Sequence, residues 1–269
     1  MSAVRLTALA IATVLLLSRA ADAATLYTDS FSGAGVNLNG QGVEGGALSP
    51  ANWSANATYF DNGSLDESVE GGAYLPFNPV VNAQYTLSLD VFNTTDRWVA
   101  LGFARDPIGS PGADQVNDRH SNEVEGIAWM LFRDHATDAT QDVQLFAGLR
   151  TNNGLLDTNA AVTHNQVNNL SIVIDTTGTG SNFTAEYFLN GSSITDADGV
   201  AGGPTGPRTV NIAVADINFV GMSYDDATTA AQITVDNFRL TAIPEPTSFA
   251  MAGLGLIGLL AVQVRRRLR

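Results

Sequence analysis

Short segments in which every second residue is apolar constrain the fold of this chain more than any other feature. Tyr85–Val91 is the clearest of them, with Thr86, Ser88 and Asp90 at its polar positions. Successive side chains of a strand point to opposite faces, so the segment predicts a strand with one buried face. Ile127–Phe132 is apolar throughout, which indicates a central strand buried on both faces. Residues 24–242 show no long 3.6-residue period, so we expect an all-β domain.

The same reasoning predicts further antiparallel strands, separated by turns rich in Gly and Asn. Asn190-Gly191 is the strongest short signal for a hairpin. Apolar positions change phase at Asp236-Asn237, which predicts a β-bulge in the last strand. We expect that strand to pair with the first, Thr25–Phe31. The other predicted strands are Val99–Phe103, Val143–Leu149, Leu170–Ile174, Phe183–Leu189, Ser192–Thr195, Val210–Val214 and Ile217–Met222. Together they predict an antiparallel β-sandwich.

The N-terminus has the composition of an export signal. Arg5 precedes the apolar run Leu6–Leu17, and Ala21-Asp22-Ala23 follows it. This order is typical of a secretory signal peptide, with Ala21 and Ala23 as the small residues of a cleavage site after Ala23. The alternative is an N-terminal membrane anchor, for which a run of 12 residues is short.

The C-terminus has a longer apolar segment. Thr247–Val264 holds 18 residues without a charge, and as a helix it would measure about 27 Å, close to the roughly 30 Å hydrocarbon core of a bilayer. A basic cluster follows it: Arg265, Arg266, Arg267 and Arg269. By the positive-inside rule this end lies in the cytoplasm. We expect a single transmembrane helix; the alternative is a buried helix of a soluble domain.

Pro244, Glu245 and Pro246 stand directly before this apolar segment. A Pro-Glu-Pro motif, a short transmembrane helix and an arginine-rich end, in this order over residues 243–269, resemble the PEP-CTERM sorting signal of Gram-negative bacteria. In that family an exosortase-type membrane protease-transpeptidase recognises the motif and processes the tail. The resemblance implies transit through the inner membrane to the cell surface or extracellular matrix. The prolines favour an extended backbone, which a protease can thread.

These signals divide the chain into a signal peptide (1–23), a β-sandwich domain (24–242) and a sorting signal (243–269). The sandwich also resembles a known family, the concanavalin-like or laminin-G-like jelly-roll domains found in many PEP-CTERM proteins. The segments that carry this resemblance are Asp29–Gly33, Trp98–Phe103, Ser171–Thr176 and Phe183–Ser192.

The predicted sandwich domain is strongly acidic. Residues 24–242 hold 25 acidic residues against 7 arginines, a formal charge of −18, and the chain has no lysine. Such a charge disfavours nucleic acid and anionic lipid surfaces as partners. The absence of cysteine excludes disulfides and thiolate metal sites.

The sequence contains no recognisable catalytic motif. Retaining glycosidases of the jelly-roll type carry a Glu-x-Asp-x-(x)-Glu strand, which is missing here. The nearest candidates for a catalytic carboxylate pair are Glu67 with Glu70 and Glu123 with Glu125. For each pair the alternative is an acidic loop exposed to solvent.

No metal-binding pattern is complete either. The three histidines lie in separate segments and are better explained as surface residues: His120, His135 and His164. Asp196–Gly199 begins like a calcium loop, but no glutamate closes it. Calcium held by loop carboxylates stays open as a hypothesis, with three candidate ligands: Asp225, Asp226 and Asp236. We expect no other cofactor.

The tryptophans are the remaining candidates for a binding surface. Trp98 and Trp129 occupy alternating positions in apolar strands, so we expect them in the core. Trp53 lies between Asn52 and Ser54 in a polar stretch, and it is the candidate for stacking on a sugar.

The sequence therefore favours a non-enzymatic surface or matrix protein whose sandwich contacts extracellular polysaccharide or neighbouring proteins. The alternative is a glycoside hydrolase or polysaccharide lyase, which would need two carboxylates about 5–9 Å apart across a groove.

Overall fold

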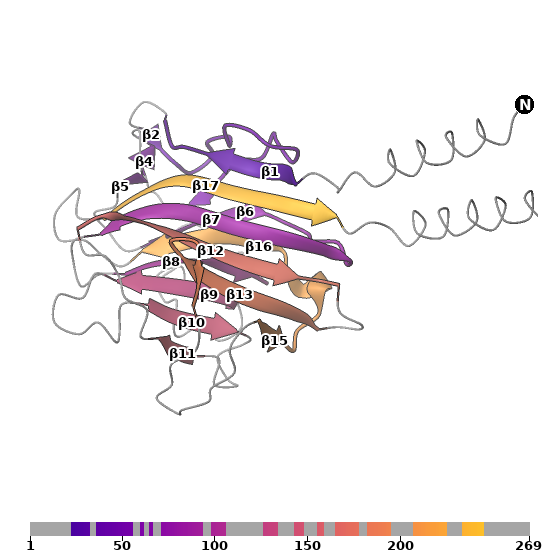
Figure 1. The fold of residues 1–269 in the computed structure, drawn as a ribbon. Helices are drawn as coiled ribbons and strands as arrows, with labels where there is room; N and C mark the ends of the chain where they lie inside the picture. The colour runs from indigo at the N-terminus through magenta and orange to yellow at the C-terminus, as the bar shows by residue number, and fades with distance from the viewer. Residues whose placement is uncertain are drawn as a thin grey trace, which may run out of the picture. The chain divides into compact units, whose positions relative to one another are not determined.

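The computed structural model describes residues 23–32, 36–55, 60–61, 65–66, 71–93, 98–105, 126–133, 143–147, 155–158, 165–177, 182–194, 207–224 and 233–244. Ala24–Ala242 forms one compact unit. Its described strands form two antiparallel sheets. Figure 1 shows that the strand axes of the two sheets are roughly aligned. This arrangement confirms the predicted antiparallel β-sandwich.

The larger sheet has ten strands among the described residues, in the order β14-β13-β12-β7-β17-β5-β4-β2, with β1 on β17 and β15 on β13. Its strands are β1 (Ala24–Asp29), β2 (Val36–Asn37), β4 (Phe60–Asp61), β5 (Leu65–Asp66), β7 (Ala83–Asn93), β12 (Val167–Asp175), β13 (Phe183–Leu189), β14 (Ser192–Ser193), β15 (Arg208–Val210) and β17 (Ile233–Pro244). The centre is the ladder of β7 with β12, in which Ser88 pairs with Ser171 and Leu89 with Leu170.

The smaller sheet has seven strands among the described residues, in the order β11-β10-β9-β8-β16-β6-β3. Its strands are β3 (Ser54–Ala55), β6 (Gly71–Pro76), β8 (Trp98–Ala104), β9 (Gly126–Arg133), β10 (Val143–Ala147), β11 (Leu155–Thr158) and β16 (Phe219–Tyr224). All seven side-chain positions of β8 are buried, so both faces of this sheet are covered at its centre.

The main core lies between the two sheets. In β7 every second residue is buried, from Ala83 to Asn93, as the alternation predicted. Leu87 and Leu89 of the larger sheet belong to the same buried cluster as Leu101 and Phe103 of the smaller sheet. Burial of side chains of this size contributes about 1.5–3 kcal/mol each, so this core supplies most of the stability.

Three local predictions are confirmed. Asn190 and Gly191 have φ angles of 52° and 75°, the left-handed pair that a type I′ hairpin needs. Asn237 has a φ of 53°, and burial changes phase there between Val235 and Phe238, as a bulge requires. The last strand pairs with the first, with Ala24 opposite Ala242.

Two local expectations differ from the structure. The strand predicted at Val210–Val214 ends at Val210, and a 3₁₀ turn, η4 (Val214–Asp216), follows. Its alternating apolar residues are still buried, so burial without strand pairing produced the same pattern. Gly71–Pro76 was not predicted as a strand, because its glycines and proline interrupt the alternation.

The predicted signal peptide and transmembrane helix lie outside the described residues, except for Ala23, Ile243 and Pro244. In the part of the chain that the structure describes, no helix is long and apolar enough to cross a membrane.

Candidate functional site

Most of the residues that the sequence singled out fall outside the described part of the chain. These are Ala21, Glu67, Glu70, His120, Glu123, Glu125, His135, His164, Asp196–Gly199, Asp225, Asp226, Glu245, Pro246, Arg265, Arg266, Arg267 and Arg269. Pro244 is described, as the last residue of β17.

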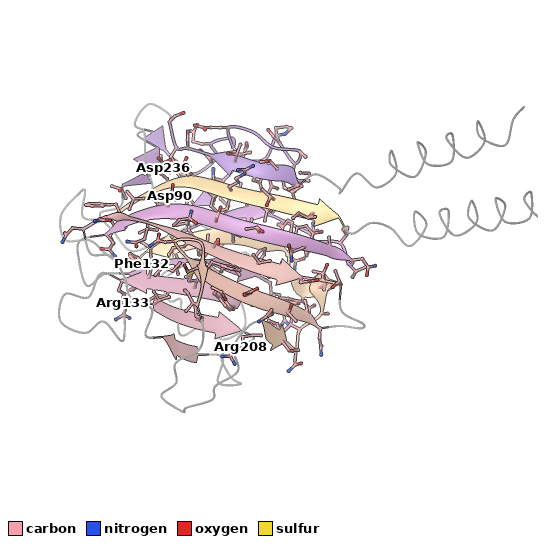
Figure 2. All side chains as sticks on the ribbon, in the orientation of Figure 1. Asp90, Phe132, Arg133, Arg208 and Asp236 are labelled. Atoms are coloured by element: carbon pink, nitrogen blue, oxygen red, sulfur yellow. The ribbon has the colours of Figure 1, made fainter. Side chains whose placement is uncertain are left out.

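Asp236, one calcium candidate, lies in a surface hydrogen-bond cluster. Its Oδ1 accepts the backbone N–H of Asn237 at 2.6 Å. The Asn237 side-chain amide donates to Asp90 at 2.9 Å, and the Asn169 amide donates to the same carboxylate at 2.8 Å. Figure 2 labels Asp90 and Asp236 near each other on the larger sheet. Among the described residues no group of three His, Asp or Glu side chains is placed to hold a metal.

The prediction that Trp53 contacts carbohydrate is wrong. Its side chain is only 1% exposed, and it packs edge-on against Phe238 with the ring centroids 4.9 Å apart. Its Nε1–H donates to Asp29 Oδ2 at 2.7 Å, so its polar atom is satisfied inside the protein. Asn52 and Ser54 are exposed; Trp53 is thus the inward position of an alternating segment.

A strained turn holds Asp29, the residue that accepts the Trp53 hydrogen bond, in place. Phe31 has a φ of 50°, which is rare for a bulky residue, and its N–H donates to Asp29 Oδ1 at 2.9 Å. The Glu44 carboxylate accepts hydrogen bonds from the backbone N–H and the hydroxyl of both Ser30 and Ser32. Partial burial raises the pKa of Glu44, but the hydrogen bonds from Ser32 and Ser30 outweigh it and lower the pKa to about 2.

Trp98 and Trp129 are buried, as predicted, but outside the main core. They lie on the face of the smaller sheet that points away from the larger sheet. We call this surface the aromatic face, and it consists of Tyr74, Trp98, Ala100, Ala104, Trp129 and Leu131, with the partly buried Phe219 packed against them. The aromatic face is a second apolar cluster, separate from the core between the sheets.

The strand register explains how these side chains meet. In the ladder of β8 with β9, Trp98 pairs with Arg133, Ala100 with Leu131 and Gly102 with Trp129. Residues that pair directly across a ladder share a face of the sheet. Arg133 therefore stands at the end of the aromatic face, while the preceding residue Phe132 is buried in the main core; Figure 2 labels both.

Two paired glycines form the floor of the aromatic face. Gly102 of β8 pairs with Gly221 of β16. A Cβ atom on Gly102 would lie 2.4 Å from Trp129 Cδ2, and one on Gly221 would lie 2.5 Å from Tyr74 Cδ1. Both rings therefore rest directly on the backbone. The rings of Tyr74 and Trp129 meet edge to face, with their centroids 6.3 Å apart.

The aromatic face also carries polar atoms that the protein does not satisfy. Among the described residues, Trp129 Nε1, Ser223 Oγ and Arg133 Nε are buried and have no hydrogen-bond partner. Each such atom costs about 1–3 kcal/mol, and native structures contain few of them. Apolar rings beside unsatisfied donors match the chemistry of a ligand that has both an apolar surface and hydrogen-bond acceptors, and in this structure the rings and donors are buried. Sequence reasoning missed this site because the glycine pair and the unpartnered atoms emerge only from the register.

Residues 242–267 match the PEP-CTERM protein-sorting motif. The chain therefore carries this motif at its C-terminus. No curated protein matches the sequence.

Several solved structures are similar to this chain at low sequence identity and low TM-score. The carbohydrate recognition domain of Emp47p is 10% identical, with a TM-score of 0.45 over 82% of this chain and 97% of that one. A protein of unknown function with a galectin-like fold from Bacillus subtilis is 14% identical, with a TM-score of 0.45 over 82% and 98%. A winged bean acidic lectin complexed with methyl-α-D-galactose is 11% identical, with a TM-score of 0.45 over 80% and 98%.

Proposed function

We propose that this chain is an exported protein, delivered to the cell surface or extracellular matrix by an exosortase-type enzyme, and that its sandwich is a non-catalytic module that binds polysaccharide. The delivery part is supported by the sorting motif over residues 242–267. The binding part is carried by a single observation, the unsatisfied donors beside the rings of the aromatic face.

The end of β17 suits recognition by a processing enzyme. The strand runs to Pro244, the first residue of the Pro-Glu-Pro motif. Ladder pairing with β1 stops at Ala242, and the next residue, Ile243, is 40% exposed. The motif thus begins two residues beyond the last residue of β17 that pairs with β1. A protease can therefore reach it after the sandwich has folded.

Replacement of Pro244, Glu245 and Pro246 by alanine tests the delivery proposal. In a host with an exosortase-type enzyme, we expect the variant to remain unprocessed in the membrane fraction, while the parent protein loses its tail. A mass shift on an immunoblot distinguishes the two forms. Normal processing of the alanine variant would refute this part of the proposal.

The chemistry of the aromatic face fits a sugar. A pyranose ring presents C–H groups that pack on an aromatic ring and oxygen atoms that accept hydrogen bonds. Trp129 offers both a ring and an N–H, and Ser223 and Arg133 add a hydroxyl and a guanidinium. Trp129 is also the most exposed of the three large rings, at 9% against 4% for Tyr74 and 1% for Trp98. We therefore assign the first sugar contact to Trp129.

A glycan array probed with the mature chain tests the binding proposal, with and without calcium. We expect binding to at least one class of polysaccharide, a loss of about tenfold in Trp129→Phe because one donor is removed, and unchanged binding in Ser171→Ala on the opposite side of the sandwich. Silence across all classes under both conditions would overturn the proposal. A calcium requirement would assign a role to carboxylates such as Asp236.

A further inference from the structure

Exposed apolar side chains gather at one end of the sandwich. The large apolar residues that are exposed among the described residues are Leu48 at 42%, Val80 at 65%, Val81 at 58%, Val167 at 63% and Ile243 at 40%. Leu48 lies in a loop that is hydrogen-bonded to β1, Val80 and Val81 lie just before β7, and Ile243 lies near the end of β17. We call Leu48, Val80 and Val81 the apolar end.

Hydrogen bonds hold both loops of the apolar end in place. The N–H of Leu48 donates to Leu26 O at 3.1 Å, which ties this loop to β1. The N–H of Val80 donates to Tyr85 Oη at 2.7 Å, and Thr176 Oγ1 donates to Val80 O at 3.0 Å. The backbone of each loop is fixed, so its apolar side chains are displayed to solvent by a defined structure.

Both chain ends leave the domain at this same end. Ala24 pairs with Ala242, and in Figure 1 the arrow of β17 ends where β1 and β7 begin. Tyr27, in the middle of β1, donates to Pro76 O at 2.5 Å, and Pro76 ends β6 just before the loop 77–82 that holds Val80 and Val81.

The tether to the predicted membrane segment is short. Five residue steps separate Ala242 from Thr247, where the uncharged segment begins. A fully extended chain covers at most about 3.6 Å per residue, so the chain between Ala242 and Thr247 can span at most about 18 Å. A tail inserted in the bilayer would therefore keep this end of the sandwich close to the lipid for as long as it is attached.

The charge distribution is compatible with a position of the apolar end close to the bilayer. The loops 45–50 and 77–82 contain no charged residue, in a segment with 25 acidic residues and 7 arginines. A strongly acidic surface is repelled by anionic lipids, so an uncharged apolar end is the part of the domain that can approach the interface at low cost.

We propose that the apolar end rests on the lipid interface of the bilayer for as long as the tail remains attached, and so orients the sandwich relative to the membrane. The inference rests on the transmembrane helix that the sequence predicts at Thr247–Val264. The apolar end contacts the lipid interface through insertion of the Leu48, Val80 and Val81 side chains, and not through charge.

Site-specific fluorescence tests this docking, and the absence of cysteine from the chain makes each label unique. Val81→Cys, Val167→Cys and Gly258→Cys are labelled with an environment-sensitive probe in residues 24–269, the chain without its signal peptide but with its tail, reconstituted in phosphatidylcholine vesicles. Val167 is the matched control, because it is a valine of similar exposure that pairs with Phe92 near the far end of β7. Gly258 lies in the predicted transmembrane segment.

Lipids with a spin label near the headgroup serve as the quencher. Interfacial apolar groups sit about 5–10 Å deep, so we expect the probe at position 81 to lose about half of its emission, while the probe at position 167 loses less than about a tenth. We expect lipids labelled deep in the acyl chain to quench the probe at position 258.

Any other result overturns the proposal that the apolar end rests on the lipid interface. Quenching at position 258 with equal, weak quenching at 81 and 167 leaves the membrane anchor intact and refutes only the docking. Equal, strong quenching at 81 and 167 shows adsorption without orientation. A blue shift at position 81 that depends on protein concentration and not on labelled lipid assigns the apolar end to a second copy of the chain. No quenching at position 258 refutes the anchor and the docking together.

Discussion

The two outward faces of the sandwich differ in composition, burial and hydrogen bonding. On the larger sheet, β7, β12 and β13 alternate strictly, and their outward residues are partly exposed and mostly polar. On the smaller sheet, the outward face is aromatic and buried. One face follows the rule for a sheet with a solvated side, and the other departs from it.

The outward face of the smaller sheet is also where buried polar atoms lack hydrogen-bond partners among the described residues. On the larger sheet, Asp90 is satisfied by Asn169 and Asn237. On the smaller sheet, Trp129 Nε1 and Ser223 Oγ have no partner among the described residues. A fold selected only for stability would replace these atoms by apolar groups, so the contrast separates the scaffold face from the face that carries a candidate function.

The largest loss of unfolding free energy should come from a substitution in the glycine pair under the aromatic face, Gly102 and Gly221. In Gly102→Ala the new Cβ would lie 2.4 Å from Trp129 and 2.6 Å from Ala128 O. The backbone must shift, and we expect a loss of about 3 kcal/mol of unfolding free energy. In the control, Gly42→Ala, the nearest atom is 3.6 Å away, and we expect less than about 1 kcal/mol. Urea unfolding measures both, and equal losses would mean that the floor is not tightly packed.

The next largest loss of stability should distinguish an indole N–H that has a hydrogen-bond partner from one that has none among the described residues. Trp53→Phe removes the donor to the buried Asp29 carboxylate, so we expect a loss of about 2–3 kcal/mol. Trp129→Phe removes an N–H without a described partner, and we expect a loss of about 1 kcal/mol, from ring volume alone. Urea midpoints of the two variants rank them, and a larger loss for Trp129→Phe would show that its N–H is satisfied in solution.

A smaller effect, of opposite sign, should come from Ser223. Ser223→Ala removes a buried hydroxyl without a described partner, and we expect a gain of about 1 kcal/mol. Ser171→Ala changes a partly exposed residue opposite Ser88, and we expect a change within about 0.5 kcal/mol. Thermal unfolding compares the two variants. Destabilisation by Ser223→Ala would place Ser223 in the scaffold and not in a binding site.

The smallest effect belongs to a region on neither face, the turn held by Glu44. Its folded pKa of about 2 lies below the ordinary value of 4.5, so its contribution is present above pH 4.5 and is lost as the pH falls towards 2. Because Glu44 is exposed, we expect only a modest drop. Glu44→Gln should flatten the stability profile between pH 4.5 and 2.5. Identical slopes for parent and variant would contradict the role of the serine hydrogen bonds.

Local sequence was enough for the parts of the fold that depend on neighbouring residues. Alternation placed β7, β12 and β13, and an uninterrupted apolar run placed β9. Asn190-Gly191 placed the hairpin, because strand faces and tight turns depend on a few consecutive residues. The phase change at Asp236-Asn237 predicted the bulge for the same reason. The Pro-Glu-Pro motif, the uncharged segment and the arginines indicated the sorting tail without any tertiary information.

The tertiary structure alone decided how each tryptophan is packed and where the exposed apolar end lies. Trp53 packs against Phe238 and donates to the carboxylate of Asp29, which stands 24 residues earlier in the chain. Trp129 rests on a pair of glycines from two other strands, and Val80 is fixed by Tyr85 and Thr176. These contacts depend on register and strand order, which a single sequence does not encode locally. The sequence thus determined the sorting motif and the sandwich, while strand pairing decided which side chains form the aromatic face and which form the apolar end.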